Sequence, residues 1–121
     1  MSKVLMVEDD ALFLKMYQKK FAREGIELEV AQDGEAGLEK AKTVKPDVVV
    51  LDLMLPKLSG SEVLKAIRNT DEIKDLPVII MTNLNASSDE VGEVLKMGVK
   101  EVLLKTDVTP AQIVEMVEKY T

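Results

Sequence analysis

One residue in the segment Pro46 to Pro56, PDVVVLDLMLP, differs in kind from its neighbours. Asp52 stands between two aliphatic runs that are typical of a strand buried on both faces, where an uncompensated carboxylate is costly. We therefore expect burial to end at Asp52. Other polar groups also follow short aliphatic runs, and these are Glu8, Asp9, Asp10, Thr82, Asn83 and Lys105. Carboxylates, a hydroxyl and an amine are the groups that phosphoryl transfer requires.

The carboxylates of Glu8, Asp9 and Asp52 need a counterion if they lie together. Two like charges about 4 Å apart repel by about 4 kcal/mol at an effective dielectric constant of about 20. Mg²⁺ suits Glu8, Asp9 and Asp52 because it takes oxygen ligands and leaves positions for phosphate oxygens. Lys105 would add a second positive charge. The chemistry expected of this set is in-line attack by Asp52 on a phosphoryl group, with Thr82 as a hydrogen-bond donor.

The chain alternates five short aliphatic runs with segments of 3.6-residue periodicity. The runs are Val4 to Val7, Leu28 to Ala31, Val48 to Leu51, Val78 to Met81 and Val102 to Leu104. The inward positions expected between and after them are Phe13, Met16, Tyr17, Phe21, Ala36, Leu38, Ala41, Val63, Leu64, Ile67, Val91, Val94, Leu95, Ile113, Val114, Met116 and Val117. This order predicts an α/β fold: a doubly wound, flavodoxin-like parallel sheet of order 2-1-3-4-5 with five helices. Ligands of such sheets bind at the carboxyl ends of the strands.

Helix ends are marked in the sequence as well. Three pairs have the capping-box spacing, and these are Ser59 with Glu62, Ser87 with Glu90, and Thr109 with Gln112. Pro110 falls at a first helical position, Asp10 is expected to cap the first helix, and Gly25 and Gly98 fit left-handed helix ends.

Composition limits the classes of function. The 121 residues suffice for one domain, and they contain no Cys and no His. This excludes thiolate chemistry, Ser-His-Asp catalysis and a histidine phosphodonor role. The formal net charge is −6, with basic residues spread along the chain, which argues against direct nucleic-acid binding. Without a membrane-spanning run or a signal-peptide pattern, we expect a cytoplasmic protein.

Other phosphate chemistries fit less well. The sequence has no G-x-x-x-x-G-K-[ST] motif, and acidic residues rather than glycines follow the first strand. Phosphatases of the haloacid-dehalogenase type need a second Asp two residues after the nucleophile, and Met54 occupies that position. Turnover as a phosphatase is therefore not expected.

Four segments together closely resemble the receiver domain of two-component response regulators, and these are KVLMVEDD, PDVVVLDLMLPKLSG, LPVIIMTN and GVKEVLLK. The resemblance implies that a histidine kinase or histidine phosphotransfer protein phosphorylates Asp52. It also implies that Glu8, Asp9, Asp52 and the backbone carbonyl of Met54 hold Mg²⁺. Thr82 and Lys105 would contact the phosphoryl group. The signal would pass to a protein partner through the fourth helix, fifth strand and fifth helix, in a monomer or a weak phosphorylation-dependent dimer.

Three positions depart from the family pattern. Thr106 replaces a common proline after the lysine, where the family has a cis peptide, and Val102 replaces an aromatic residue that rotates on activation. Asn83 replaces a small residue beside the switch hydroxyl. We expect a smaller or differently routed conformational change. Residues 1–121 are expected to form one receiver domain without an output domain. The alternatives are an interaction module that is never phosphorylated, or the receiver of a longer DNA-binding regulator.

Overall fold

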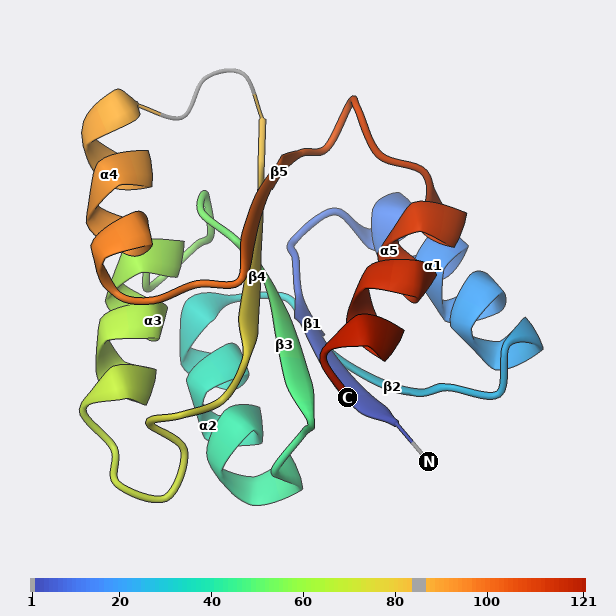
Figure 1. Ribbon diagram of the computed structural model, residues 1–121, viewed down its shortest axis with the longest axis horizontal. Coiled ribbons are helices and arrows are strands. Elements are labelled where there is room, and N and C mark those ends of the chain that lie inside the picture. Colours follow the sequence, from blue (N-terminus) through green and yellow to red (C-terminus); the bar gives the residue numbers. More distant parts are fainter. Residues whose placement is uncertain (1, 84–86) are drawn as a thin grey trace.

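The computed structural model describes residues 2–83 and 87–121, in which strands and helices alternate. The elements are β1 (Lys3–Val7), α1 (Ala11–Arg23), β2 (Glu27–Ala31), α2 (Gly34–Val44), β3 (Val48–Asp52), α3 (Gly60–Arg68), β4 (Val78–Thr82), α4 (Ser88–Lys96), β5 (Glu101–Leu104) and α5 (Pro110–Lys119). The strands form one parallel sheet in the order β2-β1-β3-β4-β5. Helices α1 and α5 cover one face, and α2, α3 and α4 cover the other (Figure 1). The predicted doubly wound, flavodoxin-like fold is confirmed.

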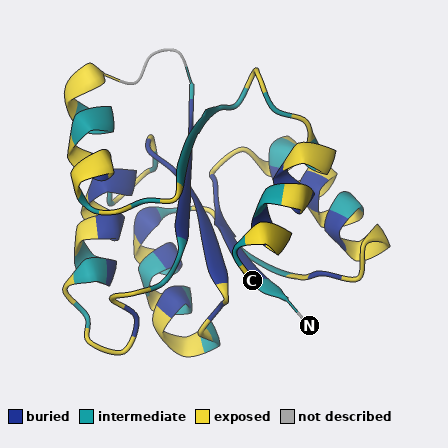
Figure 2. Cartoon of the chain, in the orientation of Figure 1, coloured by how far each residue is buried: buried dark blue, intermediate teal, exposed yellow. Residues whose placement is uncertain are grey.

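Two apolar clusters lie on opposite faces of the sheet. Side chains alternate along β3, so that Val48 and Val50 pack towards α1 and α5, while Val49 and Leu51 pack towards α2 and α3. The central strands are buried along their length, and exposed residues lie on the outer surfaces of the helices (Figure 2). A strand buried on both faces is a rigid support for the residue at its end.

The strands are longer than hydropathy predicts, because a polar residue extends each of them. These residues are Lys3, Glu27, Asp52, Thr82 and Glu101. The ladder bonds backbone groups and does not depend on side-chain polarity, so Asp52 still pairs with Met81 of β4. The prediction that burial ends at Asp52 is wrong, since this residue is only 3 % exposed.

Helix ends follow the sequence signals closely. Ser59 and Thr109 form complete capping boxes, whereas Ser87 accepts a hydrogen bond from Glu90 N, which is one half of such a box. Asp10 accepts hydrogen bonds from backbone N–H groups of α1. Gly25 and Gly98 have left-handed φ angles of 70° and 76°.

Two helix residues expected to face inward are exposed. Met16 of α1 is 43 % exposed and Leu95 of α4 is 57 % exposed. The buried stripe of α1 instead runs through Leu14, Tyr17 and Phe21, which places Met16 outside its edge. Within the described residues, no helix is long and apolar enough to cross a membrane.

Candidate functional site

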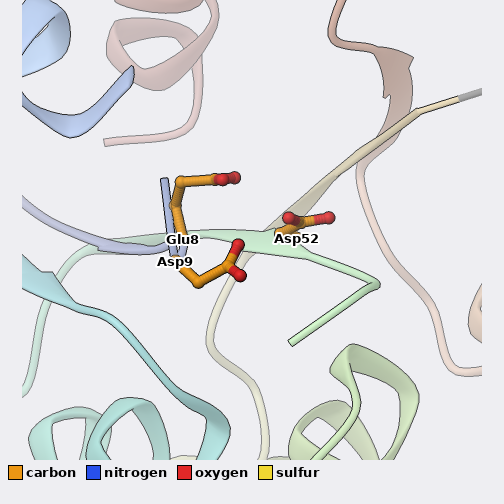
Figure 3. Close-up of side chains that lie close together, drawn as sticks. All are labelled: Glu8, Asp9 and Asp52. Carbon is orange, nitrogen blue, oxygen red and sulfur yellow. The ribbon is translucent and has the colours of Figure 1, made fainter. Parts of the chain in front are cut away.

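Three carboxylates meet at the carboxyl ends of β1 and β3. One carboxylate oxygen from each of Glu8, Asp9 and Asp52 lies within 4.8 Å of the others. The side chains of Glu8 and Asp9 extend from the end of β1 towards the end of β3 (Figure 3). Glu8 and Asp52 are almost fully buried, whereas Asp9 is exposed. Such a set of oxygens could hold a hard divalent cation, with Asp9 at its solvent side.

Lys105 supplies a positive charge to the same site. Its Nζ lies 2.5 Å from Glu8 Oε2 and 2.8 Å from Asp52 Oδ2. The backbone N–H of Lys105 donates to the carbonyl of Thr82 at 2.8 Å, which continues the ladder between β4 and β5 past the end of β5. The lysine thus joins two buried carboxylates from different strands.

Burial and charge act in opposite directions on these groups. Burial raises the pKa of the Glu8 carboxyl to about 7, although the hydrogen bond with Lys105 lowers it, and the negative charge of Asp52 adds to the rise. Burial also lowers the pKa of Lys105, but its hydrogen bonds with Asp52 and Glu8 outweigh this effect and raise it overall. Lys105 therefore stays protonated, as a donor must.

The turn after β3 fixes the Asp52 side chain. Asp52 Oδ1 accepts a hydrogen bond from Met54 N at 3.1 Å, and the other oxygen faces Lys105. Gly60 N donates to Leu53 O at 2.8 Å and closes α3 against this turn. A Cβ on Gly60 would lie 2.3 Å from the Asp52 carbonyl oxygen, so a larger residue would push this turn and α3 apart. The sequence reasoning missed Gly60, because nothing in the sequence shows this close approach.

The remaining predicted site residues surround this group. Thr82 is buried, and its hydroxyl donates to the carbonyl of Asn83 at 3.2 Å. Met54 is 47 % exposed and lines a groove of about 390 Å³ that also includes Asp9 and Glu90. The groove opens the Asp9 carboxylate to solvent, whereas Glu8 and Asp52 do not line it. The structure thus brings Glu8, Asp9, Asp52 and Lys105 together, with Thr82 and Met54 on the adjoining strand and turn.

Lys105 reaches Asp52 although Thr106, and not proline, follows it. Every described peptide bond is trans, including the bond between Lys105 and Thr106, and the ammonium group still reaches Asp52. Val102 is partly buried and packs against the cluster on the side of α3 and α4.

A 2-1-3-4-5 sheet that ends in buried acidic residues and a lysine defines a class of signalling domain, and the comparisons with known proteins agree. The family model of the response regulator receiver domain matches residues 4–118. The chain belongs to this family.

Curated relatives include proteins of two lengths. The chain is 37 % identical over 103 residues to the alkaline phosphatase synthesis transcriptional regulatory protein PhoP of Bacillus subtilis, with 85 % of this chain but only 42 % of PhoP covered. It is 29 % identical over 117 residues to the polar-differentiation response regulator DivK of Brucella anthropi, with 97 % and 94 % covered. The chain therefore spans less than half of one relative and nearly all of the other.

Solved structures with the same fold include receiver domains and a chemotaxis protein. The receiver domain of the Francisella response regulator 1452 superposes with a TM-score of 0.87 at 31 % identity, covering 99 % of this chain and 96 % of that one. Chemotaxis protein CheY4 of Vibrio cholerae superposes with a TM-score of 0.87 at 27 % identity, covering 100 % and 99 %. These likenesses extend over the whole sheet and its helices.

Proposed function

We propose that this chain is a phosphoacceptor receiver that takes a phosphoryl group from a phosphohistidine partner onto Asp52. The observation that carries the proposal is the contact between Lys105 Nζ and Asp52 Oδ2 at 2.8 Å, beside two further carboxylates. A buried carboxylate at the end of a rigid strand is a fixed nucleophile, and a neighbouring ammonium group stabilises charge on the group it attacks.

The transfer replaces contacts that Asp52, Lys105 and Thr82 make in the structure. A carboxylate oxygen of Asp52 attacks phosphorus in line, the bond between phosphorus and the imidazole nitrogen of the donor breaks, and an acyl phosphate forms. The Lys105 ammonium then donates to a phosphoryl oxygen in place of its bond to Asp52. The Thr82 hydroxyl, which now donates to a backbone carbonyl, turns to donate to a second oxygen. The phosphoimidazole of the donor carries a proton on its other ring nitrogen, so the imidazole leaves neutral on the partner protein.

The acidic group suits Mg²⁺ in its donor chemistry. Glu8, Asp9 and Asp52 offer carboxylate oxygens within 4.8 Å of one another, and we propose the backbone carbonyl of Met54 as a fourth ligand. The bound ion would neutralise negative charge on the phosphoryl oxygens. Asp9 is the exposed member of the set, so it keeps the site open to solvent and to the incoming phosphoryl group.

The phosphodonor would be a histidine kinase or a histidine phosphotransfer protein, and the output would be a protein bound at α4, β5 and α5. Phosphorylation would shift a two-state equilibrium, and a shift from 1:99 to 99:1 needs about 5.5 kcal/mol. Val102 lacks the aromatic ring that could swing between two positions, so we expect smaller amide shifts on this face than in receivers with an aromatic residue there. NMR spectra before and after phosphorylation measure this directly.

Residues 1–121 form one receiver domain in this proposal, comparable in extent with DivK. The test is intact-mass analysis after incubation with acetyl phosphate, with and without Mg²⁺. We expect one phosphoryl adduct that requires Mg²⁺ and is absent from Asp52→Asn. The matched control Asp71→Asn changes an exposed aspartate and should be labelled like the native chain. A native chain that no donor labels would instead favour an interaction module of the same fold.

A further inference from the structure

The backbone alone does not fix the position of the Lys105 ammonium group. Lys105 follows the last residue of β5 and begins a turn in which Asp107 N donates to Leu104 O at 3.0 Å. Its peptide bond to Thr106 is trans. A lysine side chain is a flexible four-carbon stem that ends in a point charge, so some other contact must select one of its rotamers.

The ring of Phe13 provides such a contact. Lys105 Nζ lies 5.1 Å from the centroid of this ring, within the range of a cation–π interaction. Strand alternation explains why Lys105 meets Phe13. Asp52 and Lys105 lie two residues after Val50 and Leu103, which pack on the α1 and α5 side of the sheet. Residues two apart in a strand point to the same face. Helix α1 lies on that side and begins just after Glu8 and Asp9.

Phe13 is itself held in place from two directions. Its backbone N–H donates to the N-cap residue Asp10, at 3.2 Å from Oδ1. Its ring lies 4.8 Å from the ring of Tyr17, and Tyr17 packs edge-on against Phe21 with 6.1 Å between the centroids. The chain has only four aromatic residues, and three of them stand in this one column. Tyr17 and Phe21 are fully buried, whereas Phe13 is partly exposed at the end beside the lysine.

We propose that Phe13 is a positioning residue, whose ring holds the Lys105 ammonium group beside Asp52 for phosphoryl transfer. The inference rests on the proposed function. A ring attracts a cation through its negative face and takes up none of the hydrogen-bond donors of the ammonium group. The ring can therefore keep its hold while Lys105 exchanges its bond with Asp52 for one with the phosphoryl group.

The test compares phosphorylation rates of Asp52 with acetyl phosphate and saturating Mg²⁺. Phe13→Leu keeps an apolar side chain but removes the ring, and we expect a rate about 3- to 10-fold lower. Phe13→Tyr keeps the ring and should stay close to the native rate. In a Lys105→Met background the Phe13→Leu substitution should change nothing further, because the interaction partner is already absent. The matched control Tyr120→Leu removes a ring that lies near Lys100 and Lys119, outside this column, and should phosphorylate at the native rate.

The results separate this inference from the proposed function. If the native chain is labelled and Phe13→Leu is labelled equally fast, the positioning role is wrong although the proposed function stands. The same conclusion follows if Phe13→Leu slows the native chain and the Lys105→Met variant by the same factor. If the native chain is never labelled, the proposed function fails. NMR then still tests the contact without any donor, because the ring should shift the Lys105 ε-methylene protons upfield in the native chain and not in Phe13→Leu. Unshifted protons in the native chain would overturn the inference.

Discussion

Two cations are partly buried at opposite ends of the domain, and their partners differ. Lys105, at the carboxyl ends of the strands, contacts the carboxylates of Glu8 and Asp52. Arg68, at the end of α3, donates to four backbone carbonyls. These belong to Met97 at 2.8 Å, Lys74 at 3.0 Å, Leu76 at 2.8 Å and Gly98 at 3.4 Å. One cation holds side chains that can react, and the other joins the end of α4 to the segment before β4.

The two cations differ in the charge of their partners. Burial lowers the pKa of Arg68, yet a guanidinium group stays charged and its carbonyl partners are neutral. Four of the five guanidinium N–H groups donate to these carbonyls. At the other end, one ammonium group faces a group of three carboxylates, so negative charge remains when all are ionised. An imbalance of charge among buried groups marks the end of the molecule that can take up a cation and a phosphoryl group.

The largest expected effect comes from removing the cation of the reactive end. Lys105→Met should lower the rate of Asp52 phosphorylation about 100-fold, the cost typical of losing one donor to a developing charge. It should also increase the stabilisation of the fold by Mg²⁺, because the ion becomes the main counterion of the carboxylates. Phosphorylation time courses and thermal melting at several Mg²⁺ concentrations measure the two effects. Lys15→Met, on the exposed face of α1, is the control, and equal behaviour of the two variants would contradict the comparison.

The matching change at the other end should affect stability alone. Arg68→Met leaves several carbonyls without their donor, and we expect a loss of about 2 to 3 kcal/mol in the free energy of unfolding. The rate of Asp52 phosphorylation should stay at the native value under conditions where the variant is folded. Denaturant unfolding gives the first quantity, with Arg23→Met, in the exposed last turn of α1, as control. A strong loss of rate in folded Arg68→Met would show that the two ends are coupled.

Alanine substitutions at Gly60 and Gly92 should change stability less, and only the first should also change the phosphorylation rate. Gly60→Ala forces a Cβ against the Asp52 carbonyl, so it should lower the free energy of unfolding by about 1 to 2 kcal/mol and slow phosphorylation as well. Gly92→Ala on α4 meets open space and should raise stability slightly. If Gly60→Ala phosphorylates normally, the turn after β3 does not set the position of the nucleophile.

A smaller loss of stability than that of Gly60→Ala is expected at Gly98, whose carbonyl accepts from Arg68. This residue has a φ of +76°, which alanine adopts only with strain, and Gly98→Ala should cost about 1 kcal/mol. Its phosphorylation rate should be native, in contrast to Gly60→Ala. Parallel melting and labelling of the two alanine variants make the comparison, and a slowed Gly98→Ala would count against the division between the two ends.

The sequence predicts the fold and the grouping of the site residues because both follow from regular geometry. Parallel strands end at a common edge, so the positions of Asp52 and Lys105 after aliphatic runs place them together. Contacts between elements are different. The ring of Phe13 beside Lys105, the carbonyls around Arg68 and the close approach of Gly60 depend on how separate elements pack, and residue spacing does not contain that information. Hydrophobic periodicity also does not fix the edge of the buried face of α1 to the residue. Met16 is apolar and adjoins the buried Tyr17, yet it lies on the exposed side.

The central claim is that Asp52, among the three neighbouring carboxylates, accepts the phosphoryl group. The most direct measurement treats the chain with acetyl phosphate and Mg²⁺, reduces the acyl phosphate with borohydride and locates the altered residue by peptide mass spectrometry. The account predicts homoserine at position 52 and unchanged Glu8 and Asp9. Reduction at Glu8 or Asp9, or an adduct that leaves Asp52 unmodified, would contradict it.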